Sequence, residues 1–165
     1  MKTILKLTTI VFTILLLSCG GKEEKKKEQI KIQTKTEKKI VKKAEKVPAS
    51  KKIDLTNKGI GSIKSVTLGA EIDQTMVTHG ADVYKKMCTA CHRIDKKFIG
   101  PAPTDILERR TPEWVMNMIL NPEQMTKEDP LAKELLMEFN GAPMANQGLS
   151  EEDARAVLEY FRTLN

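Results

Sequence analysis

Residues 88–92 read Cys88-Thr89-Ala90-Cys91-His92, which is a C-x-x-C-H motif. Two thiols three residues apart on one helical turn can both reach the vinyl groups of a haem, and the adjacent histidine then faces the iron. The motif therefore predicts one covalently bound haem c, with Cys88 and Cys91 as thioether partners and His92 as the proximal iron ligand. The other ring nitrogen of His92 needs a hydrogen-bond acceptor to fix its tautomer and orientation.

The motif has three other interpretations. A redox C-x-x-C is expected beside a βαβ pattern, and none is visible here. Half of a zinc site needs a second Cys/His pair, which a chain with three Cys and two His does not provide. A disulfide between Cys88 and Cys91 is unusual at this spacing. The cysteine count favours the haem, because it then leaves only Cys19 to explain.

Residues 1–18 have the features of an export signal. A short basic start precedes an apolar run at 7–17, which is too short to span a membrane comfortably but suits a signal peptide. Leu16-Leu17-Ser18-Cys19 resembles a bacterial lipobox, so Cys19 is predicted to be lipidated. A plain signal peptide and an uncleaved anchor helix are the alternatives. We expect an extracytoplasmic protein, lipid-anchored to a bacterial membrane at its periplasmic face or at the cell surface.

The net charge of +6 is distributed unevenly along the chain. Residues 1–52 sum to +10, whereas residues 53–165 sum to −4. The Lys/Glu-rich range 19–52 lacks aromatic residues and is predicted to be a disordered tether. Residues 53–75 hold sparse apolar positions among Gly, Ser and Thr, which predicts an extended segment that packs loosely on the folded domain. Nucleic-acid binding is not expected, because the domain is acidic and the lysines lie beside the predicted lipid anchor.

The folded domain is predicted to cover residues 76–165. All aromatic residues except Phe12 lie between residues 84 and 161, and large apolar side chains mark where a core forms. A domain of this size has a small core, so we expect the haem to fill part of it and the domain to be largely unfolded without haem. The pattern predicts an all-α fold without strands, with four or five helices at about 77–91, 104–109, 112–121, 127–140 and 150–164.

The sixth iron ligand is predicted to be Met144. This residue lies in the stretch 141–148, which has no helical period, and a rigid irregular loop can direct a thioether at a metal. The other methionines resemble core residues, which is their usual role. Met125 and an open or histidine-ligated site are the alternatives. His79 is expected at the surface, because it lies on the same predicted helix as the haem cysteines.

These residues together resemble the small monohaem class I cytochromes c over about residues 76–165. In that family a glycine and an aromatic residue of the N-terminal helix pack across the C-terminal helix. The matching positions here are Gly80, Tyr84, Val157 and Tyr160. The resemblance implies a helical domain around one covalently bound haem, with the glycine allowing close approach of the two backbones.

The resemblance also implies two supporting residues at the haem. The Gly100-Pro101 pair resembles the loop whose proline carbonyl accepts the hydrogen bond of the proximal histidine, so Pro101 would be the acceptor for His92. Arg109 matches a family arginine that pairs with a haem propionate, and Arg110 is the alternative.

The implied function is single-electron transfer between respiratory partners, not an enzymatic activity. The pattern is similar to lipoprotein cytochromes c of Bacteroidetes, whose partners would be a membrane quinol-oxidising complex and a terminal reductase or oxidase, with nitrous-oxide reductase as one candidate. Residues 80–110 sum to +3, which would suit an acidic docking site, although an ordinary solvated face is the alternative. A haem sensor or small-ligand-binding protein with an open or labile sixth site is the second functional hypothesis.

Overall fold

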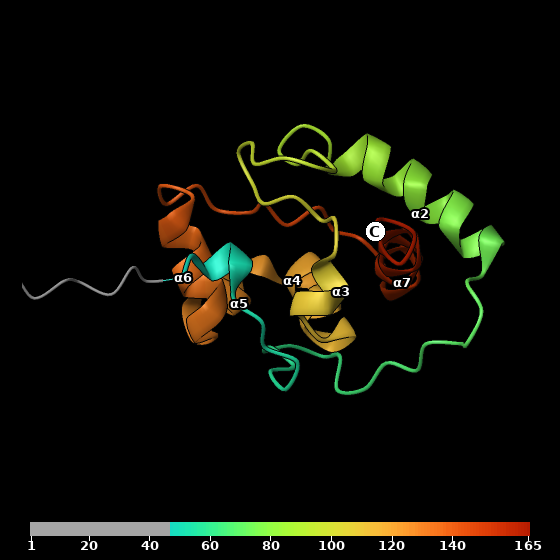
Figure 1. Ribbon diagram of the computed structural model, residues 1–165, viewed down its shortest axis with the longest axis horizontal. Helices are drawn as coiled ribbons and strands as arrows, with labels where there is room; N and C mark the ends of the chain where they lie inside the picture. The colour runs from blue at the N-terminus through green and yellow to red at the C-terminus, as the bar shows by residue number, and fades with distance from the viewer. Residues whose placement is uncertain (1–46) are drawn as a thin grey trace, which may run out of the picture. The chain divides into compact units, whose positions relative to one another are not determined.

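The computed structural model describes residues 47–165. The predicted signal peptide, Cys19 and most of the predicted tether lie outside this range. The described part is helical, as predicted, and its β-type pairing is a single isolated bridge between Asp54 and Arg110. Within the same range no helix is both long and apolar enough to cross a membrane. The elements are η2 Ala49–Lys51, α2 Gln74–Met87, α3 Ile106–Arg109, α4 Pro112–Leu120, α5 Pro122–Glu128, α6 Pro130–Glu138 and α7 Glu151–Phe161 (Figure 1).

The first and last long helices, α2 and α7, cross at close range (Figure 1). Gly80 lies at the crossing, where a side chain would clash with the backbone of Ala156. The Tyr84 ring fills the space beside it, with its centroid 5.6 Å from that of Tyr160 and 5.7 Å from that of Phe161. The predicted packing of Gly80 and Tyr84 across the C-terminal helix is therefore confirmed.

Proline and a capping side chain together divide the middle of the chain into short helices. The prediction of one helix over 127–140 is wrong, because α5 ends at Glu128 and α6 begins at Pro130. Proline lacks the N–H that a continuous helix would need and favours the first helical position. Asp129 caps α6 by accepting a hydrogen bond from the Ala132 amide at 2.7 Å. The same combination of cap and proline opens α4 at Thr111 and α5 at Asn121.

The helix α2 ends at Met87, four residues earlier than predicted. The motif residues that follow form a tight turn, in which the amides of Cys91 and His92 donate to the Cys88 carbonyl at 3.0 and 2.9 Å. The turn keeps both thiols and the histidine on one short stretch of chain at the end of α2.

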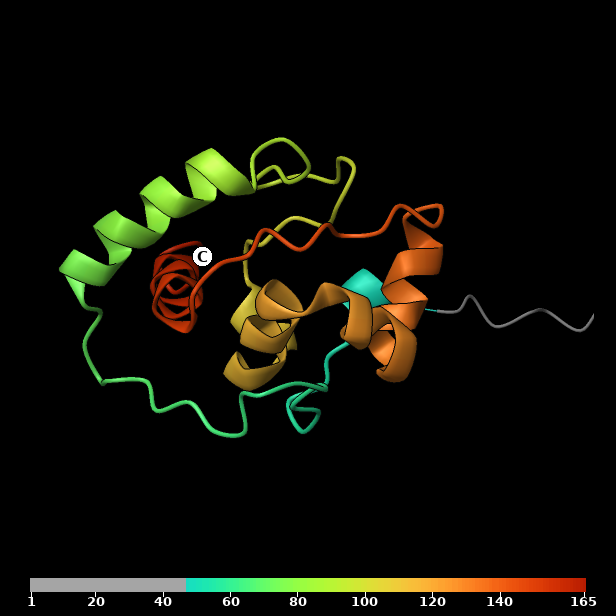
Figure 2. The ribbon, with the colours of Figure 1, turned by 180° about the vertical axis from the view of Figure 1, so that it is seen from behind.

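The segment before α2 is packed more firmly than predicted. Figure 2 shows it running from η2 past α4 and α7 to the start of α2. Asn117 of α4 bonds to both backbone groups of Ile63, at 3.0 and 2.9 Å, and to the Lys58 carbonyl at 3.0 Å. Arg110 donates to the carbonyls of Ala49 and Lys52 at 2.7 and 2.5 Å. Residues 49–52 therefore belong to the folded part, which differs from the expectation that they continue the tether.

The apolar core lies between α4, α6 and α7, with the N-terminal segment against its outer side. Its buried side chains include Trp114, Met116, Leu135, Phe139 and Leu158. The Trp114 indole N–H donates to Asp129 at 3.1 Å, so the residue that caps α6 also fixes the largest ring of α4.

Candidate functional site

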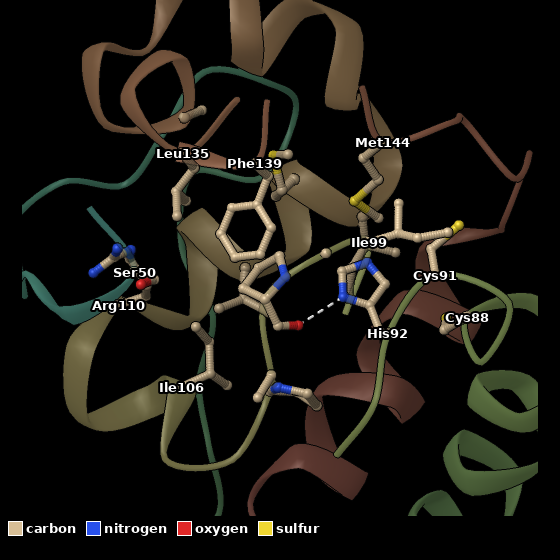
Figure 3. A pocket seen from close by; sticks show the side chains of 18 of the residues that line it. Ser50, Cys88, Cys91, His92, Ile99, Ile106, Arg110, Leu135, Phe139 and Met144 are labelled. Atoms are coloured by element: carbon tan, nitrogen blue, oxygen red, sulfur yellow. Dashed lines mark hydrogen bonds between the residues drawn. The ribbon is translucent and has the colours of Figure 1, made fainter. Parts of the chain in front are cut away.

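A cavity of about 210 Å³ lies between α2, α4, α6, α7 and the loops that join them. Its lining is predominantly apolar, and it reaches the surface, because the exposed Cys91 and Ile99 form part of its wall. Cys88, His92 and Met144 also line it (Figure 3). The tertiary structure thus brings the predicted haem-binding residues, which are up to 56 positions apart in the sequence, to one site.

The His92 ring is held on two sides. Its Nδ1 lies 2.8 Å from the Pro101 carbonyl oxygen, the contact that the family resemblance implies (Figure 3). Its flat face rests on Gly100, where a methyl group would lie 2.8 Å from Nδ1 and 3.0 Å from Nε2. An N–H donated from Nδ1 leaves Nε2 as the nitrogen that can ligate a metal. The close approach of His92 to Gly100 was not predicted, although a glycine directly before the acceptor proline was a visible signal.

Both motif cysteines are free thiols beside His92. Burial, with a smaller contribution from the neighbouring Cys91, raises the pKa of Cys88 to about 11. The Cys88 thiol is therefore protonated at neutral pH, as expected for a group in an apolar wall. Cys91 is exposed, so its sulfur lies at the rim of the cavity, whereas Cys88 is partly buried.

Met144 lies in the loop between α6 and α7, and its thioether points toward the part of the cavity where His92 lies (Figure 3). Met125, the alternative ligand, is fully buried elsewhere, and its sulfur accepts a hydrogen bond from the Ile60 amide at 3.1 Å. His79 lies at the surface, 2.8 Å from Asp153 across the α2–α7 crossing. Of the three residues weighed as sixth ligands, only Met144 is brought to the site.

Two adjacent arginines line the cavity and have different surroundings. Arg109 donates to the Thr104 carbonyl at 2.9 Å, while its Nε is buried without a hydrogen-bond partner. Arg110 is 1% exposed, and its terminal nitrogens donate to Ala49 and Lys52, while its Nε, like that of Arg109, is buried without a hydrogen-bond partner. Burial, followed by the nearby charge of Arg109, lowers the pKa of Arg110. Neither arginine forms a direct ion pair with a carboxylate of residues 47–165, although Asp54, Asp129 and Glu138 lie close enough to favour the charged form of Arg110.

These features fit a haem. The cavity provides an apolar wall, two thiols, an oriented imidazole and a thioether. The buried Nε–H of Arg109 has no hydrogen-bond partner and could donate to a propionate. Over residues 47–165 no group of three or more His, Cys, Asp or Glu residues could hold a metal ion by itself. One imidazole and one thioether are the protein ligands that a haem iron takes in cytochromes c.

Comparison with known proteins gives a consistent result. The family model described as Cytochrome c matches residues 77–165. The solved structure of cytochrome c from Rhodothermus marinus is 42% identical, with a TM-score of 0.62, and the match covers 71% of this chain and 93% of that one. An engineered form of the R. marinus protein is 41% identical with a TM-score of 0.61, covering 71% of this chain and 94% of that one. No curated protein matched.

Proposed function

Because the chain belongs to the cytochrome c family, whose function is haem-based electron transfer, we propose that it is a monohaem carrier with His92 and Met144 as axial ligands. The observation that carries the ligand assignment is the position of both side chains on one apolar cavity, with Nδ1 of His92 already bonded to Pro101. Two protein ligands leave no coordination position for a substrate, which favours a carrier over an enzyme.

Each residue of the site has a distinct task in this proposal. When bound, the haem would supply a one-electron redox couple, that of its iron. Cys88 and Cys91 would hold it covalently, and the bond to Pro101 keeps the His92 ring in one orientation and makes it a more basic ligand. The apolar wall excludes water, and Arg109 offers its unpartnered Nε to a propionate. A thioether from Met144 would favour the reduced state and raise the potential.

We further propose that partners dock at the exposed rim beside Cys91. Three apolar side chains that follow Cys91 closely in the sequence are exposed: Ile94, Phe98 and Ile99, at 39%, 46% and 48%. Arg93 lies 4.3 Å from the Phe98 ring, and the nearby stretches of sequence carry four exposed lysines (Lys85, Lys86, Lys96 and Lys97) and one exposed acidic residue, Asp95. An acidic surface with an apolar centre is complementary to this patch. Such a surface would belong to a membrane quinol-oxidising complex or to a terminal reductase or oxidase, including nitrous-oxide reductase.

The proposal places the protein on a membrane through a lipid on Cys19, with the Lys/Glu-rich tract as a tether. Support comes from the lipobox-like residues 16–19 alone. A tether would raise the effective concentration of the carrier at membrane-bound partners. Mass spectrometry of the mature N-terminus tests this part: a diacylglycerol adduct on Cys19 supports it, and an unmodified cysteine contradicts it.

Optical spectroscopy of the oxidised protein tests the ligand assignment. A Met–iron charge-transfer band that resists added cyanide, and that is absent in Met144→Ala, supports the carrier. A high-spin iron that binds cyanide or carbon monoxide at once would instead indicate a haem sensor or small-ligand-binding protein. Survival of the band in Met144→Ala would show that another residue is the ligand.

A further inference from the structure

The loop that carries Met144 is attached to the rest of the protein only at its ends. Residues 143–149 have hydrogen bonds only with one another: the Gln147 side chain donates to the Ala145 carbonyl at 3.4 Å, and the Gly148 amide donates to Asn146 at 2.8 Å. No hydrogen bond or ion pair joins this stretch to another described element. The position of Met144 therefore depends on where the loop begins and ends.

The loop begins at the C-terminal turn of α6. The Gly141 amide donates to the Leu136 carbonyl at 2.8 Å, and the Ala142 amide donates to the Phe139 carbonyl at 3.1 Å. Asn140 and Gly141 have positive φ values of 59° and 73°, so the chain turns sharply here. Whatever fixes this turn also fixes the start of the Met144 loop.

Glu138 fixes this turn to a segment 88 positions earlier in the chain. Its carboxylate accepts two hydrogen bonds from Ser50, from the amide at 2.8 Å and from the hydroxyl at 2.6 Å. Lys97, from the loop after His92, donates to the Glu138 carbonyl at 3.3 Å and lies 4.5 Å from the centre of the Phe139 ring. The end of α6 is thus held by η2, through Ser50, and by the loop that follows His92, through Lys97.

We propose that Glu138 is a positioning residue for the sixth iron ligand, holding the end of α6 so that the loop presents Met144 to the cavity. The inference rests on the proposed function, in which Met144 is that ligand. An added ligand binds only to the fraction of molecules in which Met144 has left the iron, so its apparent affinity measures that fraction. Loosening the end of α6 increases the fraction, and the apparent affinity rises with it.

The test is a titration of the oxidised holoprotein with imidazole, followed by its visible spectrum. Glu138→Ala is expected to raise the apparent affinity about tenfold, because two hydrogen bonds to a charged group are lost. Glu138→Gln should restore part of the wild-type value, since its amide oxygen can accept from the Ser50 amide and its NH2 group can donate to the Ser50 hydroxyl oxygen. Lys97→Met, which keeps the apolar stem but not the cation, should give about a threefold rise.

Two control variants separate positioning from general stability. Lys133→Ala removes an exposed side chain from the same helix and should leave imidazole affinity unchanged. Glu134→Ala breaks the Lys52–Glu134 ion pair, which joins the same two segments one turn before the helix end. It should lower the free energy of unfolding without changing imidazole affinity. Amide hydrogen exchange at Ala142 should accelerate in Glu138→Ala and remain at the wild-type rate in both controls.

The outcomes distinguish this inference from the proposed function. If the wild type shows the Met144-dependent band but Glu138→Ala binds imidazole no more tightly, only the role of Glu138 is wrong. If the wild type lacks that band, the ligand assignment fails and this inference fails with it. Should Glu138→Ala not incorporate haem, Ser50→Ala replaces it, with a smaller rise expected because the Ser50 amide still donates to the carboxylate.

Discussion

The imidazole of His92 occupies the space that a side chain at residue 100 would need: a methyl group on Gly100 would lie 2.8 Å from Nδ1 and 3.0 Å from Nε2. The same Nδ1 is 2.8 Å from the carbonyl oxygen of Pro101, the next residue along the chain. Two consecutive residues therefore set both the position of the ring and the direction of its hydrogen bond.

Gly100→Ala should displace the His92 ring from the Pro101 carbonyl. Overpacking of this kind costs about 1–3 kcal/mol, which denaturant unfolding of the holoprotein would show. Loss of the hydrogen bond makes the imidazole a less basic ligand, so the reduction potential should rise. Gly69→Ala is the control, since a methyl group there has its nearest neighbour at 3.3 Å. An unchanged potential in Gly100→Ala would contradict this account of the ring.

Asn117→Ala should destabilise the domain by about 2–3 kcal/mol. The substitution removes all three hydrogen bonds to Lys58 and Ile63 and leaves buried backbone groups without partners. Urea unfolding measures the effect, with the exposed Ser62→Ala as the control. A loss below about 0.5 kcal/mol would mean that the segment before α2 contributes little to stability, as the sequence analysis had expected.

Glu159→Gln should change how stability depends on pH. Burial by itself would raise the pKa of Glu159, but hydrogen bonds from Arg155 and the Asp73 amide, and from Arg162, lower it below its ordinary value. A lowered carboxyl pKa stabilises the fold above the unfolded-state pKa, and this contribution is lost as the pH falls through the folded-state pKa. The variant should therefore be less stable than wild type at pH 7, by about 2 kcal/mol.

The difference between Glu159→Gln and wild type should shrink as the pH falls through the lowered folded-state pKa of Glu159, where the wild-type carboxyl becomes protonated. Unfolding curves at pH 7, 5 and 3 would measure this trend. A destabilisation of equal size at all three values would show that the effect comes from packing and not from charge.

Preventing haem attachment should largely unfold the domain. Without the haem the apolar lining of the cavity, which reaches the surface, stays in contact with water, and the burial lost is large compared with the stability of a small domain. The double variant Cys88→Ala, Cys91→Ala, produced without haem, should show little helical circular dichroism and rapid proteolysis of residues 76–165. A cooperative thermal transition in this variant would contradict the prediction.

Local patterns account for what could be predicted from the sequence. The C-x-x-C-H motif and the spacing of Gly80 and Tyr84 on one helix are visible within a few positions, and the structure places Gly80 and Tyr84 against the C-terminal helix as the family resemblance implied. The bounds of the middle helices were predicted less accurately, because a proline such as Pro130 can either end a helix or begin a new one.

The sequence alone determined the helical class and the C-x-x-C-H motif with His92 next to Cys91, because these depend on residues close together in the chain. Only the tertiary structure decided that Met125 is buried under Ile60 while Met144 reaches the cavity, and that Ser50 holds Glu138. Such contacts join residues 54 to 88 positions apart, as in Asn117 with Ile63 and Ser50 with Glu138. Several of the partners are backbone amides and carbonyls, which every residue carries and which therefore leave no pattern in the sequence.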